Sequence, residues 1–250
     1  MREKLDESQL VGITETGDPF QHLDVFDRLY QANIIITKRL TSKLIDKLVE
    51  HKDKCILHIT CTGMGSSKLE PLVPSKEQTF EKFNELIDKG FPVEQVVLRI
   101  DPIIPTSKGI YTALSVIRLF KNSGIQRVRF SSFDIYEHVK DRFKNEGLQL
   151  PYETFHADLK TRKYLEDAMK ISTYLMNADL EACGEPNLET TSGCISQKDI
   201  DILGLTDKII LIGSADQRKV CLCASNKRQL IKTKPAPCSN GCLYCFWKSK

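Results

Sequence analysis

Short β-branched segments alternate along the chain with amphipathic segments, and this alternation restricts the fold more than any other feature. The strand-like segments are residues 10–14, 33–37, 55–61, 95–100, 127–133 and 178–182. The helix-like segments are residues 23–31, 42–51, 77–90, 109–124 and 157–175, with apolar residues at steps of three and four. Strands joined by helices form parallel sheets with right-handed crossovers. We therefore expect an α/β fold, either a doubly wound sheet or a (β/α) barrel.

Polar and glycine residues follow four of the predicted strands. They are Glu15 to Pro19, Lys38, the segment Thr62-Gly63-Met64-Gly65, and Asp101-Pro102. Ligand sites of parallel α/β folds lie at the carboxyl ends of the strands, so we expect these residues to converge in space.

One predicted strand, residues 55–61, has two different faces. His58, Thr60 and Thr62 alternate with apolar residues and with Cys61. Helices should cover the outer face of the strand, so the polar set is expected to point into the barrel mouth. The hydroxyls could equally serve only to satisfy backbone groups. Cys55 and Cys61 have apolar neighbours, and burial is expected for both.

Cysteines are numerous and unevenly distributed: the chain has nine, and seven of them lie after residue 182. The first residues, MREKLDESQ, lack the apolar core of a signal peptide, and no run of about 18 apolar residues could span a membrane. We therefore expect a cytoplasmic protein without a membrane partner, in which clustered thiols bind metal. The net charge of +3 is too small to indicate a nucleic-acid partner.

Three cysteines, Cys238, Cys242 and Cys245, form a C-x3-C-x2-C segment. Structural zinc requires four protein ligands, whereas an iron–sulfur cluster held by three thiolates leaves one iron open to another ligand. Gly241 permits a tight loop, and Tyr244 could shield a cluster or contact an adenine. Zinc with a fourth ligand from elsewhere and an inert tail remain alternatives.

This loop resembles the cluster loop of the radical S-adenosylmethionine (radical SAM) superfamily, and the segment Thr16-Gly17-Asp18-Pro19-Phe20 resembles its Gly-Gly-Glu-Pro motif. The segments TGDPFQHLD, IIITK and VVLRIDPIIP are similar to the spore photoproduct lyase branch. The resemblance implies a partial (β/α)6 barrel and a [4Fe-4S] cluster whose open iron binds S-adenosylmethionine and reduces it to a 5′-deoxyadenosyl radical. The expected cofactor-binding residues are Thr16, Gly17, Asp18, Pro19, Lys38, Thr60, Thr62, Ser131 and Tyr244.

Three charged residues are candidates for catalysis. Lys38 at a strand end could meet the S-adenosylmethionine carboxylate as a point charge. Arg99 and Asp101 share one strand face, and they form either a catalytic or cofactor-contacting pair or a structural ion pair.

The order of these parts departs from the superfamily, in which the cluster loop follows the first strand. If residues 228–233 are that strand, the layout is restored as a circular permutation, and Met1 and Lys250 should lie near each other. The whole chain also resembles an uncharacterised bacterial family with a C-terminal cluster of this type, through HITCTGMGSSKLEPLVP, EACGEPNLE, QRKVCLC and CSNGCLYC.

Four further cysteines, at C-x10-C and C-x-C spacing, suit a closed four-ligand site. An auxiliary iron–sulfur cluster is expected there, with structural zinc or unmetallated buried thiols as alternatives. Gly184 and Gly193 would give the backbone room. The four residues are Cys183, Cys194, Cys221 and Cys223.

We therefore expect a barrel core at residues 1–182, an auxiliary metal-binding segment at 183–226, and the permuted first strand with the cluster loop at 227–250. The predicted function is a radical SAM enzyme that receives electrons from a flavodoxin- or ferredoxin-like donor. The relation to spore photoproduct lyase suggests nucleic acid as substrate, by analogy alone. The alternative is a non-catalytic, metal-stabilised, nucleic-acid-associated binding module.

Overall fold

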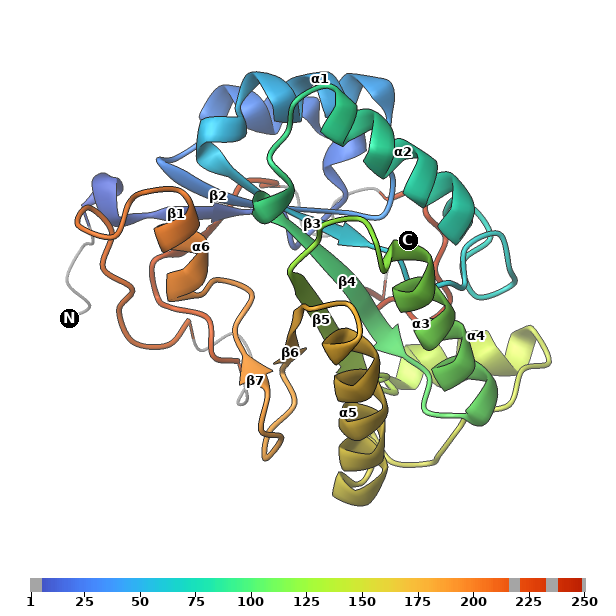
Figure 1. Ribbon diagram of the computed structural model, residues 1–250. Coiled ribbons are helices and arrows are strands. Elements are labelled where there is room, and N and C mark those ends of the chain that lie inside the picture. The colour runs from blue at the N-terminus through green and yellow to red at the C-terminus, as the bar shows by residue number, and fades with distance from the viewer. Residues whose placement is uncertain (1–5, 216–220, 233–237, 249–250) are drawn as a thin grey trace.

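A curled sheet of eight parallel strands forms the centre of the computed structural model, which describes residues 6–215, 221–232 and 238–248 (Figure 1). The strand order is β7-β6-β5-β4-β3-β2-β1-β8, and every neighbouring pair is parallel. The strands are β1 Val11–Ile13, β2 Ala32–Thr37, β3 Cys55–Thr60, β4 Val96–Ile103, β5 Arg127–Ser132, β6 Asp179–Cys183, β7 Thr191–Ser192 and β8 Lys227–Gln229. The predicted parallel α/β fold is confirmed, and its sheet is barrel-like.

The strand predicted at residues 228–233 is present as β8, but it is shorter. It pairs with β1 in the register Val11 to Lys227 and Ile13 to Gln229. The last strand along the chain therefore lies beside the first. Residue 233 and the chain ends Met1 and Lys250, which were expected to lie near each other, are outside the described residues.

Four helices pack on the outer face of the sheet, as Figure 1 shows: α1 Ser42–Glu50, α2 Lys76–Asp88, α3 Ser107–Phe120 and α5 Leu159–Tyr174. Their apolar stripes cover Ile35, Leu57, Leu98 and Val128 of the strands. Burying these stripes against the sheet supplies the main stabilisation of the fold.

The hollow of the sheet holds a helix that the sequence did not predict, α6 Gln197–Ile202 (Figure 1). Its Ile200 packs against Ile13, Ile34 and Ile56 on the inner face. On β3, Leu57 and Ile59 belong to the outer core, as does Cys61 just after the strand, and Ile56 belongs to the inner core, so the predicted two faces are confirmed.

Buried charges fix α6 to the strands. The guanidinium of Arg127 donates to Glu181 Oε1 over 2.9 Å and to Asp199 Oδ1 over 2.6 Å. Because a buried charge must be paired, this network holds α6 to β5 and β6.

The remaining helices are short. The segment predicted as a helix at 23–31 is a 3-10 helix instead, and the helix α4 Glu137–Asn145 was not predicted. No helix in the described part of the chain has the length and apolar character needed to cross a membrane. The 3-10 helices are η1 Glu7–Gln9, η2 Pro19–Gln21, η3 Leu23–Arg28, η4 Lys52–Lys54 and η5 Val93–Gln95.

Candidate functional site

A cavity of about 230 Å³ lies at the carboxyl ends of β1 to β5. The expected convergence of the strand ends is confirmed, because most predicted site residues line this cavity. They are Thr16, Gly17, Asp18, Lys38, Thr60, Arg99, Asp101, Ser131, Cys238, Cys242, Tyr244 and Cys245. Of the residues expected around the cluster and its cofactor, Pro19 and Thr62 do not line the cavity: Pro19 is buried at the start of η2, and Thr62 is buried against Glu70.

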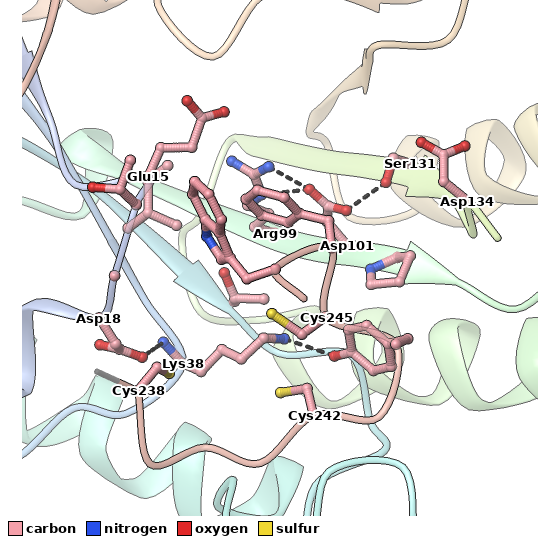
Figure 2. Close-up of a pocket in the computed structure, with 18 of the residues that line it drawn as sticks. Glu15, Asp18, Lys38, Arg99, Asp101, Ser131, Asp134, Cys238, Cys242 and Cys245 are labelled. Carbon is pink, nitrogen blue, oxygen red and sulfur yellow. Dashed lines mark hydrogen bonds and ion pairs between the residues drawn. The ribbon is translucent and has the colours of Figure 1, made fainter. Parts of the chain in front are cut away.

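The three cysteines of the C-x3-C-x2-C loop all line this cavity. Figure 2 shows the thiols of Cys242 and Cys245 pointing to the side on which Cys238 and Lys38 lie. The loop turns at Gly241, whose φ of +67° is one that glycine adopts readily. Burial raises the pKa of Cys242 to about 11. A thiolate there requires a cation or a metal.

Arg142, in α4, holds the C-terminal end of the cysteine loop. Arg142 Nη1 donates to the carbonyl of Cys245 over 2.8 Å, and its Nη2 donates to that of Trp247 over 2.7 Å. In the middle of the loop, the amide of Leu243 donates to the carbonyl of Leu69 over 3.0 Å. Hydrogen bonds to the backbone of the loop therefore hold the cysteines in place.

Asp18 joins the strand ends to the cysteine loop. Its carboxylate accepts hydrogen bonds from Thr37 Oγ1 at 2.6 Å, from the amide of Lys38 at 3.0 Å and from Asn240 Nδ2 at 2.8 Å. Burial raises the pKa of Asp18, although these donors oppose the effect. The hydroxyl of Thr16 also donates to the carbonyl of Ile231, just after β8, over 2.9 Å.

Lys38 is paired with a buried acid that the sequence analysis missed, Glu70. The ammonium lies 2.8 Å from Glu70 Oε1 and 2.9 Å from the hydroxyl of Tyr244, which itself donates to Glu70. Thr62 donates to Glu70 Oε2 over 2.6 Å. Burial alone would lower the pKa of Lys38, but Glu70 and Cys242 together raise it. The lysine therefore stays charged at the cavity wall.

Arg99 and Asp101 form an ion pair in the cavity wall (Figure 2). Arg99 Nε donates to Asp101 Oδ2 over 2.6 Å, and the hydroxyl of Ser131 donates to Asp101 Oδ1. On its other side, Arg99 Nη1 lies 3.6 Å from the sulfur of Cys194. Burial raises the pKa of Asp101, but Arg99 and Ser131 outweigh it, so the pKa is lowered.

A second cavity, of about 60 Å³, lies behind this ion pair. All four remaining clustered cysteines line it: Cys183, Cys194, Cys221 and Cys223. Glu15, Arg99, Asp101 and Ser131 line both cavities. Within residues 6–215, 221–232 and 238–248, no group of three or more His, Cys, Asp or Glu side chains lies in positions that could hold a metal ion as they stand. The four thiols that the sequence analysis grouped do line one cavity.

A histidine paired with two acids lies beside the first cavity, and the sequence analysis missed it. His156 Nδ1 lies 2.5 Å from Asp134 Oδ1, and its Nε2 lies 3.3 Å from Glu185 Oε2. Hydrogen bonds to Asp134 and Glu185 raise the pKa of His156 to about 9. Because Asp134 lines the cavity, this imidazolium helps to position a carboxylate there.

These features define an α/β protein with a curled parallel sheet and a cysteine-lined cavity at the carboxyl ends of its strands. The chain belongs to a domain family of unknown function, DUF1848, whose sequence profile matches residues 20–247. No curated protein and no solved structure matches the chain.

Proposed function

We propose that the protein is a radical SAM enzyme. The observation that carries the proposal is that the strand-end segment Thr16-Gly17-Asp18, Lys38 and the three thiols of the C-terminal loop line one cavity. The hydrogen bond between Asp18 and Asn240 joins the motif at the end of β1 directly to the cysteine loop. A chain whose cysteines only stabilised the fold would not need these strand-end residues around the thiols.

The donor set fits the proposed cluster. Three thiols around one cavity suit a [4Fe-4S] cluster with one open iron better than a structural zinc, which needs a fourth protein ligand. Cys238, Cys242 and Cys245 would hold the cluster. When bound, it supplies the electron that cleaves a carbon–sulfur bond of S-adenosylmethionine and yields the 5′-deoxyadenosyl radical.

The residues of the chain would orient the cofactor and exclude water. The ammonium of Lys38 remains charged beside Glu70 and can attract a carboxylate, while the ion-paired Asp101 can accept hydrogen bonds. Phe133 and Trp247 add apolar surface to the cavity. Excluding water strengthens each of these electrostatic contacts.

The position of β8 supports a circularly permuted partial barrel. β8 lies beside β1, where the first strand of the superfamily barrel would lie, and it precedes the cysteine loop in the chain. In the proposed (β/α)6 arrangement, β8, the last strand along the chain, therefore takes the place of the first barrel strand.

Anaerobic reconstitution tests the proposed activity. The full chain is loaded with iron and sulfide, and then incubated with dithionite and S-adenosylmethionine. We expect 5′-deoxyadenosine from the parent chain and none from the Cys238→Ala/Cys242→Ala/Cys245→Ala variant, while Cys55→Ala, which changes a buried thiol of the outer core, should retain the activity. A fully loaded cluster that gives no 5′-deoxyadenosine would favour the non-catalytic binding module, and nucleic-acid binding would then be measured directly.

A further inference from the structure

We propose that Cys183, Cys194, Cys221 and Cys223 bind a single zinc ion that joins the two edges of the curled sheet. This site is separate from the three-cysteine loop, and the proposal holds whether or not the protein is a radical SAM enzyme. It selects zinc over the auxiliary iron–sulfur cluster that the cysteine spacing alone favoured.

The close approach of the four thiols favours one ion. The sulfurs of Cys183 and Cys194 are 3.3 Å apart, the amide of Cys194 donates to the sulfur of Cys223 over 3.1 Å, and Cys221 lines the same small cavity. Four thiolates bound to one zinc at about 2.3 Å in a tetrahedron lie about 3.8 Å from one another. The separation of Cys183 and Cys194 is therefore close to the spacing that a single tetrahedral ion requires.

An iron–sulfur cubane would need a wider arrangement. Each of its four thiolates binds a different iron at a corner of the cluster, so the sulfurs are held well apart. A two-iron cluster would separate one pair of thiolates from the other, yet here the hydrogen bond from the amide of Cys194 to the sulfur of Cys223 connects the two pairs.

The surroundings suit a buried tetrathiolate, which carries a net negative charge with zinc. Arg99 Nη1 lies 3.6 Å from the sulfur of Cys194, and Arg129 Nη1 donates to the carbonyl of Cys194 over 3.1 Å. The amide of Cys194 also donates to the sulfur of Cys223 over 3.1 Å. Cations and N–H donors around the thiolates offset the cost of burying their charge.

The four ligands come from opposite edges of the sheet. Cys183 ends β6 and Cys194 closely follows β7, at one edge; Cys221 and Cys223 shortly precede β8, at the other. An ion bound by all four would close the open half-barrel. Because the ion would bind only the folded chain, its binding would contribute to the free energy of folding.

A zinc ion at this site would also affect the wall of the first cavity. Arg99 contacts both Cys194 and Asp101, so the ion would fix one end of the ion pair in the cavity wall. It would also fix the segment that leads through β8 into the cysteine loop. Its role in this proposal is structural, since four thiolates leave no open position on the metal.

Metal analysis of the full-length Cys238→Ala/Cys242→Ala/Cys245→Ala variant tests the proposal, because only the four-thiol site then remains. Grown with both metals and purified without oxygen, it should contain about one zinc per chain and no iron. Adding Cys221→Ser and Cys223→Ser should remove that zinc, while adding Cys55→Ala should not. Iron in the triple variant, the absence of both metals, or zinc retained without Cys221 and Cys223 would each overturn the proposal.

Cobalt substitution provides a measurement that does not need the Cys221→Ser/Cys223→Ser chain to fold. Zinc is removed from the triple variant, and Co²⁺ is added. A tetrahedral tetrathiolate should give intense thiolate-to-cobalt charge-transfer absorption at one equivalent, and zinc should displace it. Cobalt bound without that absorption would contradict the four-thiol site. These readouts involve no S-adenosylmethionine, so they can succeed even if the proposed activity fails.

Discussion

The side-chain amide of Asn240 donates a 2.8 Å hydrogen bond to the buried carboxylate of Asp18, although 222 positions separate the two residues in the chain. The same carboxylate caps the amide of Lys38 and binds the hydroxyl of Thr37. One side chain therefore organises the ends of two strands and the cysteine loop together.

Replacing Asp18 by alanine should destabilise the protein by about 3 kcal/mol, because it leaves buried donors of Thr37, Lys38 and Asn240 without their acceptor. Urea unfolding of the metal-free chain measures the change. The matched control is Asp24→Ala, at an exposed ion pair with Arg28, where we expect a change of at most about 0.5 kcal/mol. Equal effects at the two positions would contradict the role assigned to Asp18.

Replacing Lys38 by methionine should cost about 3–5 kcal/mol, because Glu70, with a side chain only 1% exposed, would keep a buried charge without its cation. The double variant Lys38→Met/Glu70→Gln should recover much of that stability. A double-mutant cycle from denaturant unfolding measures the coupling. Additive costs would show that the pair is not coupled.

The pair of His156 with Asp134 and Glu185 should make stability depend on pH. The pKa of His156 rises from an ordinary 6.5 to about 9, so its contribution is complete below pH 6.5 and is lost as the pH rises through about 9. His156→Gln should therefore cost about 2 kcal/mol at pH 6 and little at pH 10. Unfolding of both chains across this range measures the difference. A pH-independent difference would contradict the ion pairing.

Replacing Gly193 by alanine should push the two halves of the four-thiol site apart. A Cβ at this position would lie 2.8 Å from the carbonyl oxygen of Leu222, which is backbone and cannot rotate away. We expect a loss of about 1–3 kcal/mol and weaker zinc binding. The neighbouring Ser192→Ala serves as control, and zinc competition with a chelator compares the two. Equal zinc affinity would argue against this close approach.

The strands could be predicted, except for the two-residue β7, because their apolar, β-branched runs and polar ends are local features. The two faces of β3 followed from the alternation of His58 and Thr60 with Leu57 and Ile59. The helices α4 and α6 were missed because they carry few buried apolar residues: α4 buries only Val139 and Phe143, and α6 only Ile200, too few to give a clear period. Segment 23–31 has apolar residues at helical steps, yet it forms only the 3-10 helix η3.

The candidate site could be predicted where residue type and spacing carry the information, as with the cysteines and the strand-end residues. Glu70, Asn240 and His156 were missed because their roles depend on partners distant in the chain. Glu70 acquires its role only when Lys38 and Tyr244 fold against it. A linear sequence gives no direct sign of such pairings.

The position of the cysteine loop after every strand of the sheet also sets an order of events during translation. The ribosome synthesises β1 to β8 before Cys238, so the three thiols are the last part of the cavity wall to be added. A chain interrupted at any codon before this point would lack the thiols at the cavity entirely. If the proposed cluster binds in this cavity, prematurely terminated chains would be unable to hold it, and it would load only onto chains whose sheet has been completely synthesised.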